Sequence, residues 1–187
     1  LFRRRGEFDR AVRIHTHLLN RADLPASARS QALAELGQDY LKGGLLDRAE
    51  DAFTRLLEDA HHRFDALRAL LRIYQMEREW LKAVDCARLL EREAGESHGQ
   101  AISHFFCEMA AGALERGSFD DTQKAIDEAL AANRKSVRAL ILAGDLEMKR
   151  GNRGDALRQW LNVEAASPEH VPLIAGRVAD AMDAAGD

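Results

Sequence analysis

A small side chain recurs along this chain at intervals close to 34 residues. The positions are Ala11, Ala49, Ala83, Thr122 and Ala156, separated by 38, 34, 39 and 34 residues. Glycine stands five residues before four of these anchors, at Gly6, Gly44, Gly117 and Gly151. A period of about 34 residues is typical of repeats that consist of two short helices, which bury their apolar stripes only by stacking.

The second interval shows the pattern most completely. One helix face is predicted from the spacing i, i+3, i+4, i+7 of Leu33, Leu36, Gly37 and Tyr40. Gly44 can end that helix at a positive φ without steric cost. A second helix is predicted from the spacing of Ala49, Phe53 and Leu56. Together these residues match the signature of the tetratricopeptide repeat, in which a small anchor lets two helices cross closely.

The sequence therefore predicts an all-α fold, a right-handed superhelical solenoid of antiparallel helix hairpins in a single tetratricopeptide-repeat domain over residues 1–187. The expected repeats span about residues 1–20 (partial), 27–59, 63–94, 98–132 and 136–166, followed by a partial or capping helix over 169–185. Two positions depart from the pattern. Arg78 replaces the turn glycine of the third repeat, so its turn could differ, and Glu147 replaces the tyrosine of the fifth.

Composition excludes several classes of protein. The net charge of −4 argues against a general binder of nucleic acid or anionic membranes. No apolar run reaches about 18 residues, so no membrane insertion is expected of this chain. Cys86 and Cys107 form no C-x-x-C pair and are interpreted as reduced thiols packed among helices. Because the chain begins at Leu1, we interpret it as a piece of a longer protein.

No catalytic motif is present, so an enzyme is not expected. The chain lacks G-x-S-x-G, a Walker loop, H-E-x-x-H and a Rossmann fingerprint. The close histidine pairs, His15/His17 and His61/His62, are spaced so that their side chains diverge on a helix. No metal site or other cofactor is predicted. Trp160 and Trp80 fit the packing register of the second helices better than a ligand-stacking role.

In each repeat, the face of the first helix that does not pack in the core should line a concave groove. The candidate partner-binding residues on it are Gln38, Lys42, Arg68, Arg72, Gln75, Met76, His104, Arg138, Ile141 and Met148. Arg68 and Arg72 are one turn apart, so their guanidinium groups can share one acidic partner. With His104 and Arg138 expected nearby, the pattern predicts a basic spot that binds a protein segment with acidic and apolar anchors. The alternative is an ordinary solvated helix face.

Several segments resemble the lipopolysaccharide assembly protein B family (LapB, also called YciM). They are Leu1–His15, Leu36–Tyr40, Asp47–Phe53, Ile73–Gln75 with Glu79 and Trp80, and Ile102–Glu108. The resemblance covers most of the chain and weakens after about residue 150.

This resemblance implies a function. Family members are bacterial inner-membrane proteins with one N-terminal transmembrane helix, cytoplasmic tetratricopeptide repeats and a C-terminal rubredoxin-like metal site. They restrain lipopolysaccharide synthesis by promoting degradation of the deacetylase LpxC by the membrane protease FtsH. The resemblance thus implies a non-enzymatic adaptor at the cytoplasmic face of the inner membrane, with FtsH and LpxC as partners. The membrane anchor and the metal site are expected to lie outside this chain.

Two other functions compete with the adaptor. A receptor for chaperone tails would clamp a C-terminal carboxylate, but it wants Lys and Asn where this chain has Ala34 and Gln38, or Arg68 and Arg72. An enzyme fragment is disfavoured by the missing motifs. A homodimer through the apolar ends of the array is left open.

Overall fold

The structure is a computed structural model that describes residues 8–183, and every regular element in that range is a helix. The all-α prediction is therefore confirmed for the described residues. The chain forms two compact units, residues 1–97 and 98–187, which are described separately. The expectation of a single domain over residues 1–187 stays a prediction.

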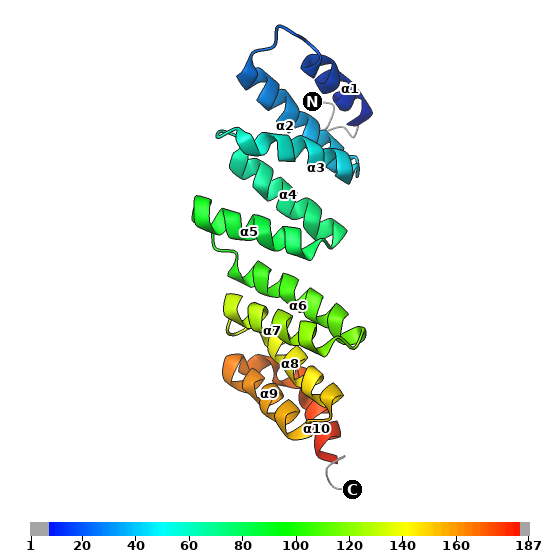
Figure 1. The fold of residues 1–187 in the computed structure, drawn as a ribbon, viewed down its shortest axis with the longest axis vertical. Helices are drawn as coiled ribbons and strands as arrows, with labels where there is room; N and C mark the ends of the chain where they lie inside the picture. The colour runs from blue at the N-terminus through cyan, green and yellow to red at the C-terminus, as the bar shows by residue number, and fades with distance from the viewer. Residues whose placement is uncertain (1–7, 184–187) are drawn as a thin grey trace. The chain divides into compact units, whose positions relative to one another are not determined.

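The first unit contains one helix followed by two hairpins (Figure 1). Its elements are α1 (Phe8–Leu19), α2 (Ala26–Lys42), α3 (Leu46–Arg55), the short 3₁₀ helix η2 (Leu56–Glu58), α4 (Arg63–Glu77) and α5 (Trp80–Ala94). Helix α2 packs against α1 and α3, and α4 packs against α3 and α5. Each first helix is therefore held between the second helix of the preceding repeat and its own partner. The turn expected around Gly6 lies outside the described residues.

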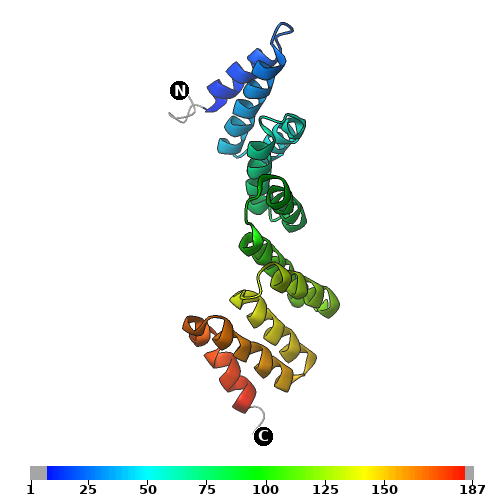
Figure 2. The same ribbon diagram turned by 90° about the vertical axis from the view of Figure 1, so that its left-hand side faces the viewer.

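The second unit contains two further hairpins and a terminal segment (Figure 2). Its elements are α6 (Gly99–Glu115), α7 (Phe119–Ala132), α8 (Val137–Arg150), α9 (Arg153–Ala166), the 3₁₀ helix η3 (Pro168–Leu173) and α10 (Ala175–Asp183). Helix α8 packs against α6, α7 and α9, and α10 packs against α9. The second unit thus repeats the hairpin arrangement of the first.

The five anchors occupy equivalent buried places, as the register predicted. Ala49, Ala83, Thr122 and Ala156 have no exposed surface, and Ala11 is 5% exposed. Thr122 is the polar exception, and its Oγ1 donates a hydrogen bond of 2.8 Å to the Ser118 carbonyl oxygen. This bond satisfies the hydroxyl within its own helix, so a threonine can replace alanine at a closed crossing.

The two helices of each hairpin also match in side-chain size at a second position. Around each of the last four anchors, the residues twelve before and four after it form a pair: Gly37 with Phe53, Leu71 with Ala87, Ala110 with Ile126, and Gly144 with Trp160. A Cβ atom on Gly37 would lie 2.9 Å from Phe53 Cζ, and one on Gly144 would lie 2.2 Å from Trp160 Nε1. Each pair therefore combines one large and one small residue, which fills the crossing without overlap.

The turns within the hairpins use the left-handed backbone region. Gly44, Gly117 and Gly151 have φ angles of 72°, 74° and 84°. Arg78, at the equivalent position of the third repeat, adopts φ 59° and ψ 27°. The suggestion that this turn could differ is therefore wrong, because the packing of α4 on α5 imposes the same backbone on an arginine.

Replacing Arg78 with glycine should stabilise the first unit by about 0.5 kcal/mol. Glycine removes the left-handed strain of about 1 kcal/mol or more, and its larger unfolded-state entropy offsets part of this gain. Urea denaturation measures the difference. Arg88→Gly, in the interior of α5, is the control and should instead destabilise by about 1 kcal/mol. Destabilisation by Arg78→Gly would contradict the strain argument.

In each hairpin of the first unit, an arginine near the start of the first helix bonds to the end of the preceding helix. Arg29 Nη1 donates a 2.9 Å hydrogen bond to the Leu19 carbonyl oxygen, and Arg63 Nη1 donates one of 2.7 Å to that of Leu57. Arg29 and Arg63 are 34 residues apart, and both acceptors stand eight residues after an anchor. These bonds satisfy carbonyl groups at a helix end that has no intrahelical donor.

The single helix expected over residues 169–185 is wrong in detail. Residues Pro168–Leu173 form the 3₁₀ helix η3, and α10 begins only at Ala175. Pro172 has no backbone N–H and its ring obstructs the preceding turn, so an α-helix cannot run through it. Residues 184–187 lie outside the described range.

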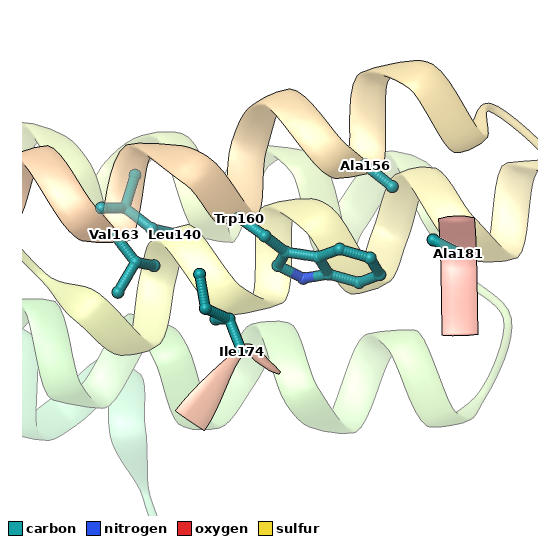
Figure 3. Packing of buried hydrophobic residues seen from close by; sticks show 6 residues of the cluster. All are labelled: Leu140, Ala156, Trp160, Val163, Ile174 and Ala181. Atoms are coloured by element: carbon teal, nitrogen blue, oxygen red, sulfur yellow. The ribbon is translucent and has the colours of Figure 1, made fainter. Parts of the chain in front are cut away.

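The terminal segment nevertheless closes the core of the second unit. Ile174 and Ala181 are buried in a cluster with Leu140, Trp160 and Val163 (Figure 3). Trp160 is 2% exposed and its Nε1 donates a hydrogen bond of 3.2 Å to the Ile141 carbonyl oxygen. The prediction that Trp160 fills the core is therefore confirmed, whereas Trp80 is only half-buried at the start of α5.

Candidate functional site

A groove of about 590 Å³ lies in the first unit between α2 and α4. Its apolar lining comes from Ala34, Leu41, Phe53, Leu56, Ala66 and Ala69, and its polar lining from Gln31, Glu35, Gln38, His61, His62, Asp65, Arg68 and Arg72. Three of the predicted binding residues, Gln38, Arg68 and Arg72, therefore share one groove. The first helices carry them because their other face is occupied by the hairpin core.

The guanidinium group of Arg68 is already paired with two carboxylates. Its Nη1 donates 2.7 Å to Asp65 Oδ1, its Nε donates 3.0 Å to Glu96 Oε1, and its Nη2 contacts the same Glu96 oxygen. These pairs, with Glu96 contributing most, raise the pKa of Arg68. The charge of Arg68 is thus neutralised within the unit.

Arg72 differs from Arg68 although both line the groove. Within the described residues it makes no hydrogen bond or ion pair, and its side chain is exposed. Lys42, beyond the end of the groove on α2, is likewise exposed and without a partner in the described part of the chain. Arg72 is therefore the groove-lining cation that is available to a ligand.

Histidine and amide groups line the other end of the groove. His62 Nε2 lies 3.3 Å from Gln31 Oε1, and His62 Nδ1 lies 3.4 Å from Asp59 Oδ1. A hydrogen bond from Ser30 and one from the His61 backbone lower the pKa of Asp59 to about 2. This end of the groove is thus held by a polar network between α2 and the loop before α4.

The remaining predicted residues of the first unit stand outside the groove lining. Gln75 is exposed on α4, and Met76 is 54% exposed at its end. Both remain on the same helix as Arg72, one turn further along. Their role in binding stays a prediction.

In the second unit the predicted basic residues are compensated by an acid. Arg138 Nη1 contacts Glu108 Oε1 and lies 3.4 Å from His104 Nδ1, and His104 Nε2 lies 3.9 Å from the same Glu108 oxygen. His104 and Arg138 are thus brought together, as expected, but around a carboxylate that the basic-spot hypothesis did not include. The apolar candidates Ile141 and Met148 are partly buried against the core cluster of Trp160.

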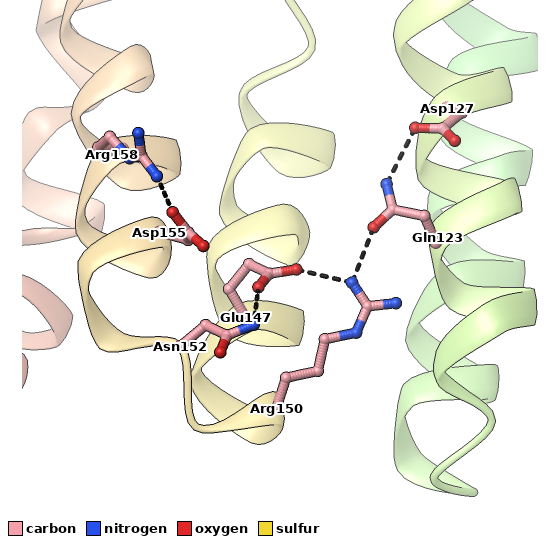
Figure 4. Close-up of polar contacts among 7 residues, drawn as sticks. All are labelled: Gln123, Asp127, Glu147, Arg150, Asn152, Asp155 and Arg158. Carbon is pink, nitrogen blue, oxygen red and sulfur yellow. Dashed lines mark hydrogen bonds and ion pairs between the residues drawn. The ribbon is translucent and has the colours of Figure 1, made fainter.

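Glu147, at the position where Tyr40 and Tyr74 stand in the earlier repeats, organises a polar network (Figure 4). It accepts 2.7 Å hydrogen bonds from Arg150 Nη1 and from Asn152 Nδ2. The Asn152 bond contributes most to lowering the pKa of Glu147. A second hollow, of about 660 Å³, borders this network along α9. Its arginine, Arg158, is paired with Asp155, so the hollow offers no free cation.

The structure shows no other candidate chemistry in residues 8–183. No three His, Cys, Asp or Glu side chains in this range are placed to hold a metal ion. Every helix in it is too short or too polar to cross a bilayer. Cys86 and Cys107 are buried free thiols, and burial raises the pKa of Cys86 to about 11. Such thiols are poor nucleophiles at neutral pH.

Sequence reasoning missed the acids that hold the predicted arginines. Glu96 stands 28 residues from Arg68, and Glu108 stands 30 residues from Arg138. Asp65, three residues before Arg68 on one helix face, carried a local signal for pairing. Glu96 carried none, because its side chain reaches Arg68 only through the turn after α5.

Helix hairpins with small anchors at each crossing, left-handed turns and a groove between successive first helices define a tetratricopeptide-repeat protein. Comparison with curated proteins narrows this class. The chain is homologous to lipopolysaccharide assembly protein B, with 37% identity to the Escherichia coli (strain K12) protein over 171 residues, 91% of this chain. The Haemophilus influenzae protein of the same name is 32% identical over 170 residues. The resemblance predicted from the sequence is thus confirmed.

The chain spans 44% of the Escherichia coli protein and 43% of the Haemophilus influenzae protein. No family model matches it.

Solved structures with similar helical folds include MamA, a tetratricopeptide-repeat protein from Parabacteroides merdae and TTC0263 from Thermus thermophilus. The match to MamA has 18% sequence identity and a TM-score of 0.48, and it covers 91% of this chain and 95% of the MamA chain. The Parabacteroides protein is 20% identical, covers 97% and 72%, and has a TM-score of 0.49. TTC0263 is 17% identical, covers 95% and 91%, and has a TM-score of 0.40. These global similarities are weak, and the assignment of the fold depends on the hairpins themselves.

Proposed function

We propose that this chain is a non-enzymatic scaffold that binds a segment of a partner protein in the groove between α2 and α4. The observation that carries the proposal is the combination, in one groove, of an apolar lining with the available guanidinium of Arg72. Extended peptides are commonly recognised by such a combination, in which apolar contacts give affinity and a charged anchor fixes orientation.

The homology gives this scaffold a specific context. The curated relatives are named for lipopolysaccharide assembly. We propose that the chain acts as an adaptor of this kind at the cytoplasmic face of the inner membrane. Its partners in this proposal are the deacetylase LpxC and the protease FtsH, whose encounter it promotes so that LpxC is degraded. No cofactor takes part.

Capture from a bacterial membrane extract tests the proposal. The immobilised chain should retain LpxC or FtsH, identified by mass spectrometry. Arg72→Glu should reduce that capture about tenfold, because a carboxylate repels the acidic anchor where a guanidinium attracts it. Adding Arg68→Glu should deepen the loss.

Arg13→Glu is the matched control, because Arg13 is an exposed arginine on α1 outside the groove. It should leave capture unchanged. The melting temperature of Arg72→Glu should also stay near that of the parent chain, since Arg72 makes no hydrogen bond or ion pair within the described residues. Retention of a chaperone through its C-terminal tail, with neither LpxC nor FtsH, would replace the adaptor by the tail receptor. Equal capture by Arg72→Glu and the parent chain would remove the groove from the proposal.

A further inference from the structure

Glu96 pairs with the groove-lining Arg68 in the way that an acidic ligand would. It follows Gly95, whose φ of 68° ends α5 in a left-handed turn. That turn brings the Glu96 carboxylate back to Arg68, where one oxygen accepts from both Nε and Nη2. The guanidinium group of Arg68, which lines the groove, is thus already paired with an acid from the turn that follows α5.

We propose that Glu96 is an internal competitor for an acidic segment of the partner, and that the partner's carboxylates bind Arg72 first and then displace Glu96 from Arg68. This inference rests on the proposed function and names the chemistry of the segment. It also assigns different roles to two arginines that are one turn apart.

The exchange costs little because the internal pair is exposed. Arg68 is 50% exposed and Glu96 is 29% exposed, so water reaches both partners. Ion pairs of this exposure contribute little to stability, and either carboxylate can be replaced by another at small cost. Arg72, one turn away, supplies a charge that the internal acid does not neutralise.

The charges that line the groove indicate that the ligand is acidic. Asp65 and Glu96 both lie on Arg68, and Glu35 accepts a 3.3 Å hydrogen bond from Gln31. Among the groove-lining charges in residues 8–183, the one that no neighbour satisfies is the cation of Arg72. A basic segment would find the acids engaged, whereas an acidic segment finds Arg72 free and Arg68 exchangeable.

The test measures binding of a fluorescein-labelled peptide of alternating Glu and Leu residues by fluorescence anisotropy, at one fixed ionic strength because exposed pairs weaken with salt. Glu96→Gln keeps the size of the side chain and removes its charge. It should tighten binding about three- to fivefold, and Arg72→Ala should weaken binding at least fivefold. A peptide with Gln in place of Glu should bind neither variant measurably better than the parent chain.

Glu93→Gln is the matched control. Glu93, near the end of α5, accepts two hydrogen bonds of 2.8 and 3.1 Å from Arg63, which does not line the groove. It should leave the peptide affinity unchanged. Equal tightening by Glu93→Gln and Glu96→Gln, no tightening by Glu96→Gln, or no binding of the acidic peptide to any variant would overturn the inference. Retention of LpxC or FtsH from membrane extract would still support the adaptor in each of these cases.

Discussion

Alanine in place of Gly144 should lower the free energy of unfolding by about 3 kcal/mol, because it overfills a closed crossing. The added Cβ would lie 2.2 Å from Trp160 Nε1 and 2.4 Å from Trp160 Cδ1. The indole cannot retreat, since it is 2% exposed and its Nε1 is bonded to the Ile141 carbonyl oxygen. Urea denaturation followed by circular dichroism measures the loss.

Gly154→Ala is the matched control on the partner helix. Gly154 lies in α9, and a Cβ there would meet no atom within 4 Å. The same chemical change should therefore stabilise by up to about 1 kcal/mol through helix propensity. If both alanines shifted stability in the same direction, the contact with Trp160 would not be the cause.

The fourth repeat supplies the compensating residues. It has Ala110 and Ile126 where the fifth repeat has Gly144 and Trp160. Trp160→Ile alone should destabilise by leaving a cavity and losing the bond to Ile141. The double variant Gly144→Ala/Trp160→Ile should lose at least about 2 kcal/mol less unfolding free energy than the sum of the losses of the two single variants. Strict additivity would mean that the two positions do not share one space.

The repeat register could be predicted because it depends on local spacing. Small anchors recur with the length of a hairpin, and the turn glycines stand at a fixed distance before them. The structure places Ala49, Ala83, Thr122 and Ala156 in fully buried positions, as this register requires. Even the departure at Arg78 obeys the register, since tertiary packing imposed the left-handed turn on a residue that disfavours it.

The charges of the candidate site could be predicted only in part. The spacing of Arg68 and Arg72 placed both on the groove face, as the structure shows. Glu96, which pairs with Arg68, and Glu108, which pairs with Arg138, come from a turn and from another helix, so neither of these two pairings has a sequence period. The helix expected over residues 169–185 begins only at Ala175, as α10, because Pro172 disfavours the interior of an α-helix.

A buried charge between α1 and α2 gives the second large effect. The Asp39 carboxylate has no exposed surface, and its Oδ2 lies 2.6 Å from His15 Nδ1. His15→Ala should lower the free energy of unfolding by about 3 kcal/mol, because it leaves a buried carboxylate without this partner. The loss should appear in urea denaturation as a lower midpoint. His17→Ala, at an exposed position of the same helix, is the control and should change stability by less than about 0.5 kcal/mol.

The loss is expected because the buried carboxylate loses its contact with His15, and a second substitution separates this effect from the loss of the imidazole itself. Leucine has the same branched side-chain shape as aspartate and needs no hydrogen bond, so Asp39→Leu removes the buried carboxylate that loses its His15 contact in His15→Ala. The double variant His15→Ala/Asp39→Leu should therefore recover at least about 1.5 kcal/mol of the loss caused by His15→Ala alone. If the double variant were no more stable than His15→Ala, packing of the imidazole between α1 and α2, and not pairing of the carboxylate, would be what His15 contributes.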